Sequence, residues 1–306
     1  VETAALPALS FTYTTFSPQA RRIERFRSTV VPPPGLGEDV TLVDLGGTAL
    51  PSAFRLDAQG GTYWENRGDL TWGPPQPLRS LPAGVALSDP GVRFADMEGR
   101  GNADLVVGRD HGGGYYPNRP GEGFIRKKNV ALAPSFDLTE DDGHLLDLDG
   151  DRVSDFLTFR NGTPIAFFNR RGDAWSAPVV LADSGLPNLG GLSRRVRLAD
   201  MNGDGQTDVV LLQSRQIQYW PYLGNGKWGA VRTMADTPDF GGALIERDVF
   251  IADLNSDGTA DLIVVGNSEV RVYLNRGGEG YSEPIVLART PRAGFDRVLL
   301  ADMKGS

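Results

Sequence analysis

The sequence of 306 residues contains no cysteine and only two histidines. Without cysteine the chain has no disulfide, no thiolate metal ligand and no cysteine nucleophile. No apolar run approaches the roughly 18 residues that a membrane-spanning helix needs, so no direct membrane span is expected. The formal net charge of −8 disfavours nucleic acid as a partner, because phosphate binding requires a concentrated basic surface.

Glycine and a recurring aspartate motif are what the chain has in abundance. Its 39 glycines and 21 prolines separate short β-rich runs, which indicates tight turns and few long helices. Six times, a short apolar run ends on Asp and is followed by a small polar loop. These residues are Asp44, Asp96, Asp147, Asp200, Asp253 and Asp302, at intervals of 52, 51, 53, 53 and 49 residues. A period near fifty is typical of a propeller or a solenoid.

The repeat with the clearest pattern predicts four short strands. Residues 195–199 alternate in polarity, a polar loop follows at 200–207, and 208–212 form an apolar, β-branched run. Residues 216–220 alternate again, and a fourth strand is expected near 228–233 after a Gly-Asn-Gly turn. Four short antiparallel strands joined by tight turns make one propeller blade.

Aromatic residues recur at fixed places in these repeats. One lies in each third strand, and a second set is expected to open the fourth strands: Trp72, Phe124, Trp175, Trp228 and Tyr281. We expect the rings to fill the space between neighbouring blades. The alternative is a set of rings that binds a ligand.

The two ends of the chain predict one further blade made of both. The third-strand aromatic lies 31 to 33 residues before the next loop Asp, and 31 residues before Asp44 stands Tyr13. Residues 9–28 are therefore predicted to form the third and fourth strands of a blade whose first strand is 298–302. Its second strand is expected just past Ser306. The predicted fold is an all-β six-bladed β-propeller, with five complete blades plus one composite blade that joins N- and C-terminal strands.

Residues 1–306 are interpreted as a single propeller domain. Because the sequence starts at Val1 and ends within the sixth motif, we expect it to be a fragment of a much larger protein.

Three of the six loops share one spacing of oxygen donors, which predicts structural calcium at up to three sites. The candidate ligands are Asp147, Asp149, Asp151 and Asp155 in one loop, Asp200, Asn202, Asp204 and Asp208 in the next, and Asp253, Asn255, Asp257 and Asp261 in the third. Alternate oxygens on a tightly curled loop converge on one point, and calcium takes six to eight hard oxygen ligands. The alternative is that these side chains only cap turns.

The first two loops have lost this set of donors. Arg100 stands where the third oxygen should be, and the loop after Asp44 offers only Gly46, Thr48 and Ser52 at the later positions. A lost metal site lowers local stability, so residues 40–145 are the candidate partner interface or moving part.

The sequence predicts no catalytic residue and therefore no enzyme. His111 and His144 lack a second histidine at metal-ligand spacing, and no serine has the surroundings of a catalytic triad. No nucleophile or pair of carboxylates is placed for acid–base chemistry.

The motifs resemble two families, one broad and one narrow. The calcium-type loops with flanking strands are similar to FG-GAP/VCBS propeller repeats. The block Leu198–Gly205 followed by Tyr219–Gly229 resembles the propeller of the B component of bacterial toxin complexes, a module that also begins SpvB-type virulence proteins. The segments Phe11–Thr15 and Asp89–Val92 fit the same family.

The narrower resemblance implies a secreted bacterial protein with a non-catalytic role in binding and gating. In that family the propeller docks onto the translocation channel of the A component and gates passage of a toxic region held in a cocoon of Rhs repeats. The implied partners are the A component and an Rhs-containing remainder of the same chain.

Two rival hypotheses remain open. One is a calcium-dependent carbohydrate-binding lectin with sugars stacked on Trp64, Trp175 or Trp220. The other is a propeller enzyme such as a polysaccharide lyase, which would need a catalytic base that the sequence does not place.

Overall fold

The computed structural model describes most of the chain. Described are residues 39–57, 60–80, 82–108, 113–130, 143–181, 183–189, 195–240, 248–289 and 300–304, together with 17, 26–27, 29–30, 32, 138 and 192. Within these residues every regular element is a strand. None of them forms a helix with the length and apolar character that a membrane crossing requires.

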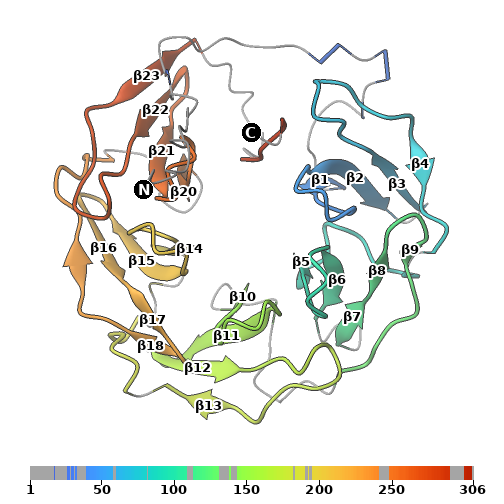
Figure 1. Cartoon of the computed structure of the whole chain (residues 1–306), viewed down its shortest axis with the longest axis horizontal. Coiled ribbons are helices and arrows are strands. Elements are labelled where there is room, and N and C mark those ends of the chain that lie inside the picture. Colours follow the sequence, from blue (N-terminus) through green and yellow to red (C-terminus); the bar gives the residue numbers. More distant parts are fainter. Residues whose placement is uncertain are drawn as a thin grey trace, which may run out of the picture.

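The strands form five blades arranged in a ring, with the first strand of each blade nearest the centre (Figure 1). Blade 1 consists of β1 (Val40–Val43), β2 (Ser52–Asp57), β3 (Gly60–Trp64) and β4 (Gln76–Pro77). Blade 2 consists of β5 (Val92–Ala95), β6 (Asp104–Val107) and β7 (Gly114–Tyr116), followed by the hairpin β8 (Asn118–Arg119) and β9 (Gly123–Phe124). Blade 3 consists of β10 (Gly143–Leu146), β11 (Asp155–Arg160), β12 (Thr163–Phe167) and β13 (Val179–Val180).

Blades 4 and 5 follow the same order. Blade 4 consists of β14 (Val196–Ala199), β15 (Asp208–Gln213), β16 (Gln216–Trp220) and β19 (Arg232–Thr233), with the hairpin β17 (Tyr222–Gly224) and β18 (Lys227–Trp228) between the last two. Blade 5 consists of β20 (Val249–Ala252), β21 (Asp261–Val265), β22 (Glu269–Tyr273) and β23 (Ile285–Ala288). The prediction of an all-β propeller is therefore confirmed.

The second strand of each blade explains the apolar runs of the sequence. All four residues of β6 are buried, as are the first five residues of β11 and of β15. Such a strand lies between two other strands of its own sheet and between two neighbouring blades, so both of its faces need apolar side chains. Fourth strands are short and lie at the rim, and in β13 both residues are exposed.

The second set of aromatic residues has a different place from the one expected. Trp72, Phe124, Trp175, Trp228 and Tyr281 each pair with the residue at the start of a small hairpin, before the fourth strand begins. The rings close this hairpin because the chain must turn before it can pair with the third strand. The expectation that aromatic rings pack between blades is correct for Phe124, Trp220, Trp228 and Tyr281, each of which lies in a cluster shared by two blades. Trp64 and Trp72 are buried in a cluster of blade 1 residues that Val30 and Met303 adjoin.

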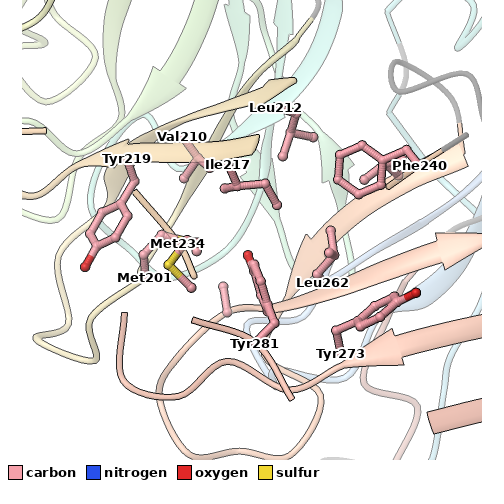
Figure 2. Close-up of a cluster of buried hydrophobic side chains, with 12 residues drawn as sticks. Met201, Val210, Leu212, Ile217, Tyr219, Met234, Phe240, Leu262, Tyr273 and Tyr281 are labelled. Atoms are coloured by element: carbon pink, nitrogen blue, oxygen red, sulfur yellow. The ribbon is translucent and has the colours of Figure 1, made fainter. Parts of the chain in front are cut away.

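Hydrophobic clusters join blade 1 to blade 2, blade 2 to blade 3, blade 3 to blade 4 and blade 4 to blade 5. Between blades 4 and 5, Val210, Leu212 and Ile217 of one sheet meet Leu262 and Tyr281 of the next (Figure 2). A fully buried side chain of this size contributes roughly 1.5–3 kcal/mol, so these clusters are the main force that holds blade to blade.

The described residues form five blades, whereas the sequence predicted six. Residues 300–302 were expected to end a first strand but lie in no strand. A first strand is held by its second strand, as β20 is by β21, and no described strand forms a ladder with residues 300–302. The other expected strands of that blade fall in residues 9–28, of which the structure describes only 17 and 26–27.

Candidate functional site

In each of the five described blades, the aspartate loop joins the first strand to the second. In blade 4, Asp200 Oδ1 accepts hydrogen bonds from the N–H groups of Asn202 (3.3 Å) and Gly203 (2.7 Å), and Oδ2 accepts one from Gly205 N–H (2.7 Å). Asp253 in blade 5 holds its loop in the same way. The first Asp of each repeat therefore caps the curled loop, whether or not the later donors are present.

The later donors of blade 4 lie at the exposed end of the loop. Asp204 N–H donates to Asn202 Oδ1 at 3.0 Å, and Asn202 Nδ2 donates to Asp204 Oδ2 at 2.9 Å. Asn255 and Asp257 repeat both bonds in blade 5, at 3.0 Å and 2.8 Å. Both the metal-binding and the turn-capping interpretations require this curl of the loop.

In blade 3 the structure brings three carboxylates together. One oxygen from each of Asp147, Asp149 and Asp151 lies within 4.8 Å of the other two. Neighbouring Asp151 and Asp147 add to burial in raising the pKa of Asp149. The loop closes through Arg152, which has φ 68°, where blades 4 and 5 have Gly205 (φ 79°) and Gly258 (φ 88°).

The fourth Asp of each predicted set is buried at the start of the second strand. Asp155, Asp208 and Asp261 are each 0% exposed. In each case one carboxylate oxygen accepts from the N–H of the residue after the loop Asp, at 2.9 to 3.1 Å, and the other from the N–H fourteen residues on, at 2.7 to 2.8 Å. The sequence predicted a ligand here; the structure adds a role in joining three strands.

Burial sets the acidity of these carboxyl groups. It raises the pKa of Asp155 to about 7, and that of Asp208 and Asp261 to about 6. The two backbone hydrogen bonds lower each pKa, while the other carboxylates of the same loop raise it further. A nearby cation would relieve this repulsion, because it favours the charged form of a carboxyl group.

The donor set suits calcium by its chemistry. Every predicted ligand offers a carboxylate or amide oxygen, and hard oxygen donors are what calcium selects. In the loops of blades 4 and 5, none of the carboxylates forms an ion pair with a described basic residue. These two loops therefore carry negative charge that no described basic residue pairs with, whereas among the described residues only blade 3 brings three carboxylates within 4.8 Å of one another.

The two degenerate loops differ from each other. In blade 1, Asp44 still accepts from the N–H groups of Gly46, Thr48 and Ala49, and the loop carries no second carboxylate. In blade 2, Glu98 and Asp104 are present and both contact the guanidinium of Arg100.

A row of buried side chains, which we call the inter-blade clasp, was missed by the sequence reasoning. In it the carbonyl after the loop Asp of one blade accepts a hydrogen bond from the residue that follows the third strand of the next. The donors and acceptors are Asn118 Nδ2 to Leu45 O (2.9 Å), Asn169 Nδ2 to Met97 O (3.1 Å), Tyr222 OH to Leu148 O, Asn275 Nδ2 to Met201 O (2.8 Å) and Asn66 Nδ2 to Met303 O (3.2 Å). The recurrence of Asn shortly after the third-strand aromatic in four of the five blades was the signal.

Of the two histidines, the structure describes His144. His144, expected in an exposed loop, lies on the first strand β10, half-buried, with its ring 6.3 Å from that of Phe159. Strand pairing with β11 fixes it there. His111 lies outside the described residues.

A pocket of about 370 Å³ opens between blades 1 and 2. Its wall includes Tyr63, Glu65, Gln76 and Arg119, together with the loop residue Thr48. Tyr63 OH donates to Gln76 Oε1 at 2.8 Å. The pocket therefore presents an aromatic ring beside groups of both charges.

Comparisons with known proteins agree with this architecture. Residues 147–211 and 200–264 match the family model described as FG-GAP-like repeat. None of the curated protein sequences matches the chain. The chain resembles the Photorhabdus luminescens Tc holotoxin pore with a TM-score of 0.64 and 24% identity, over 83% of this chain and 12% of that one.

Two further solved structures show the same fold. TcdB2-TccC3 without its hypervariable C-terminal region gives a TM-score of 0.52 and 25% identity, over 94% of this chain and 13% of that one. A lectin from Agrocybe aegerita, which recognises non-reducing terminal N-acetylglucosamine, gives 0.58 and 20%, over 82% and 65%. The chain thus spans a small part of the toxin proteins. It is a β-propeller in which residues 147–264 are FG-GAP-like repeats.

Proposed function

We propose that this chain is the propeller of the B component of a bacterial toxin complex and works as a non-catalytic docking and gating module. The observation that carries the proposal is the pattern of coverage. The likeness to TcdB2-TccC3 takes in 94% of this chain and only 13% of that one, so the chain corresponds to one module of a much longer protein. The Tyr219–Gly229 block lies in β16 and the following hairpin, on the fold that this family would require.

The proposed partner is the channel of an A component, with an Rhs-containing remainder of the same chain as the second contact. The proposed setting is outside a bacterium, after secretion. A ring of blades suits a gate, since the first strands of the blades surround the centre of the ring (Figure 1).

Calcium at up to three loops is part of the proposal. It would be held by the oxygens of blades 3, 4 and 5 and would add binding free energy to the folded state. Support comes from the convergence of Asp147, Asp149 and Asp151 and from the uncompensated charge in blades 4 and 5.

A sixth, composite blade between blades 5 and 1 also belongs to the proposal. The support is the inter-blade clasp: Met303 O meets Asn66 Nδ2 as Met201 O meets Asn275 Nδ2. Residues 300–304 also line a cavity of about 590 Å³ with the loop of blade 5, whose wall includes Leu70 of blade 1. This segment therefore lies where a sixth first strand would end.

The test is a binding measurement with the chain immobilised and a purified A-component channel in solution. We expect saturable binding in calcium. When EDTA replaces calcium, the amount of bound channel should fall only in proportion to the fraction of the chain that unfolds. A heat-denatured sample of the same chain is the control. Absence of binding to the channel, together with a folded chain, would overturn the docking role.

A carbohydrate-binding role is the second candidate, favoured by the pocket beside Tyr63 and Arg119. Of the three rings first considered for stacking sugars, Trp64 and Trp220 are only 7% and 6% exposed, whereas Trp175 is partly exposed. Under this role the chain should bind specific glycans on a glycan array, and the substitution Tyr63→Ala should abolish that binding.

A further inference from the structure

The loop of blade 2 has the backbone of a calcium loop and a different charge at its centre. Asp96 accepts hydrogen bonds from Gly99 N–H at 2.7 Å and Gly101 N–H at 2.6 Å. Asp200 of blade 4 accepts from the residues three and five positions after it, both at 2.7 Å. The two loops therefore have the same curl, and the position that holds Asp204 in blade 4 holds Arg100 in blade 2.

Arg100 points its guanidinium at the two carboxylates that occupy ligand positions. Its Nη2 donates to Asp104 Oδ1 at 3.1 Å, and its Nη1 pairs with Glu98 Oε2. The side chain of Asp104 is 0% exposed and that of Glu98 is 10% exposed, while that of Arg100 is 30% exposed. A planar guanidinium can satisfy several oxygens at once and stays charged at every relevant pH.

We propose that Arg100 is the internal cation of blade 2, where its guanidinium takes the place that calcium takes in blades 3 to 5. This inference rests on the proposed calcium sites. The blades then differ in their need for metal. The loop of blade 2 keeps its geometry without calcium, whereas the loops of blades 3 to 5 depend on bound calcium.

Charge balance around Glu98 supports this assignment. The loop contributes three carboxylates, from Asp96, Glu98 and Asp104. Three basic groups lie beside this loop, and all three contact Glu98. They are Arg100, Lys128, whose Nζ lies 2.7 Å from Glu98 Oε1, and Arg119, whose Nη2 lies 3.5 Å from Glu98 Oε2. The loop of blade 4 also has three carboxylates, at Asp200, Asp204 and Asp208, and no ion pair among the described residues balances them.

The same network joins blade 2 to blade 3. Tyr115 OH lies 2.8 Å from Glu98 Oε1 and 3.1 Å from Gly172 O, and Lys128 Nζ reaches Asp173 at 3.8 Å. Glu98, held by Arg100, therefore organises contacts on both sides of this joint. Blade 2 has thus exchanged its metal site for a network of side chains.

The first experiment measures the Tm of a variant that lacks the Arg100 cation, in EDTA. Arg100→Ala leaves Asp104 buried without its partner, so we expect Tm to fall by about 5 °C, and by the same amount in calcium. Arg119→Ala is the matched control, since it removes a neighbouring arginine from Glu98 and leaves Asp104 paired; its Tm should change by less than about 1 °C. If Arg100→Ala does not fold, Arg100→Lys, which keeps the charge and loses the fork, should show an intermediate fall.

A double substitution separates the charge from packing. Asp104→Asn removes the buried charge that Arg100 balances. In a double-mutant cycle, Arg100→Ala combined with Asp104→Asn should lose less than the sum of the single losses. A packing role for Arg100 would give additive losses and would contradict the proposal.

Arg100→Asp tests whether the position is a calcium position. This substitution completes the spacing D-x-E-x-D-G-x-x-D. We expect isothermal titration with calcium chloride to show one more equivalent than the unaltered chain, and hydrogen exchange of 96–104 to become sensitive to EDTA. An unchanged stoichiometry, or an Arg100→Ala variant as stable as the unaltered chain, would overturn the inference. An unaltered chain that binds no calcium would instead refute the calcium sites and leave the ion-pair result in EDTA standing.

Discussion

Blades 2 and 4 solve one structural problem in two ways. Both curl a loop around a first Asp and both bury a later one, Asp104 or Asp208. In blade 2 an arginine of the same loop meets the buried carboxylate, whereas in blade 4 the described residues supply no cation. The comparison teaches that a repeat that lacks the later oxygen donors can still be held at this loop, because an ion pair of its own side chains meets the buried carboxylate.

The weakness expected for residues 40–145 therefore needs a finer division. The loop of blade 1 has no second carboxylate after Asp44 and no basic residue, and the pocket opens beside it. Blade 2 is tied to blade 3 through Glu98, Lys128 and Tyr115. Of the two, blade 1 is the better candidate for a movable or partner-binding part.

The largest expected effect is the loss of thermal stability when calcium is removed, which tests whether the loops of blades 3 to 5 differ from that of blade 2. Calcium at 100 times its Kd should stabilise the chain by about 2.7 kcal/mol for each occupied site, so that EDTA lowers Tm strongly. Differential scanning calorimetry in calcium and in EDTA measures this. Asp204→Ala, at an exposed position, should remove the stabilisation that calcium gives at one site and should change Tm little in EDTA. Equal Tm values in calcium and EDTA would rule out the three sites.

Loss of one inter-blade clasp should come next. Asn275→Ala leaves Met201 O and Ala260 O, which accept from its Nδ2 at 2.8 and 3.0 Å, without that donor. We expect a loss of about 2–3 kcal/mol in urea unfolding, because buried groups left unsatisfied are costly.

The same change at the ring closure sharpens the proposal of a sixth blade. Asn66→Ala removes the bond to Met303 O, and a closed ring predicts a loss of the same order as Asn275→Ala. Arg215→Ala breaks an ion pair whose arginine side chain is 80% exposed and serves as the control, with a change below about 0.5 kcal/mol. A neutral Asn66→Ala would argue for a ring left open between blades 5 and 1.

A smaller effect on stability, of opposite sign, is expected in the proposed calcium loop of blade 3. Arg152 adopts φ 68°, a left-handed conformation that costs a residue with a Cβ atom roughly 1 kcal/mol. Arg152→Gly should therefore stabilise the chain by about that amount. Gly205→Ala is the reverse experiment: a Cβ there meets nothing within 4 Å, so its loss of about 1 kcal/mol reports strain alone. A destabilising Arg152→Gly would show that the arginine has a contact that outweighs the strain.

The smallest expected effect is a pH dependence in blade 2. Burial raises the pKa of Asp104, against the backbone hydrogen bonds from Asn118 and Met97 and the charge of Arg100. Its folded pKa lies above the unfolded value, so protonation favours the folded state as pH falls into that window, and the benefit is lost as pH rises through it. Arg100→Ala raises the pKa further, so its loss of Tm should be smaller at pH 5 than at pH 7.5. An equal loss at both values would mean that Asp104 does not titrate in this range.

Much of the architecture could be predicted from local pattern. The period of the Asp motif and the apolar run of each second strand gave the blades, because strand burial and turn chemistry are read along the chain. The place of Trp72 or Trp228 was predicted less well, since a hairpin before the fourth strand depends on how far the chain must travel at the rim. The pairing of Arg100 with Asp104 and Glu98 could not be predicted, because a long side chain reaches its partners only once the loop has curled.

The sequence by itself determined that this chain is a ring of repeated β-sheets with an aspartate at the same corner of each. Alternation, turn residues and spacing act over a few positions, and they carry that information without tertiary contacts. Only the tertiary structure decided what each corner does. The buried Asp208 joins three strands, Asn275 reaches across to Met201 of the neighbouring blade, and Arg100 meets carboxylates that the ring encloses. These roles depend on contacts between blades and on exclusion of water, which no local pattern records.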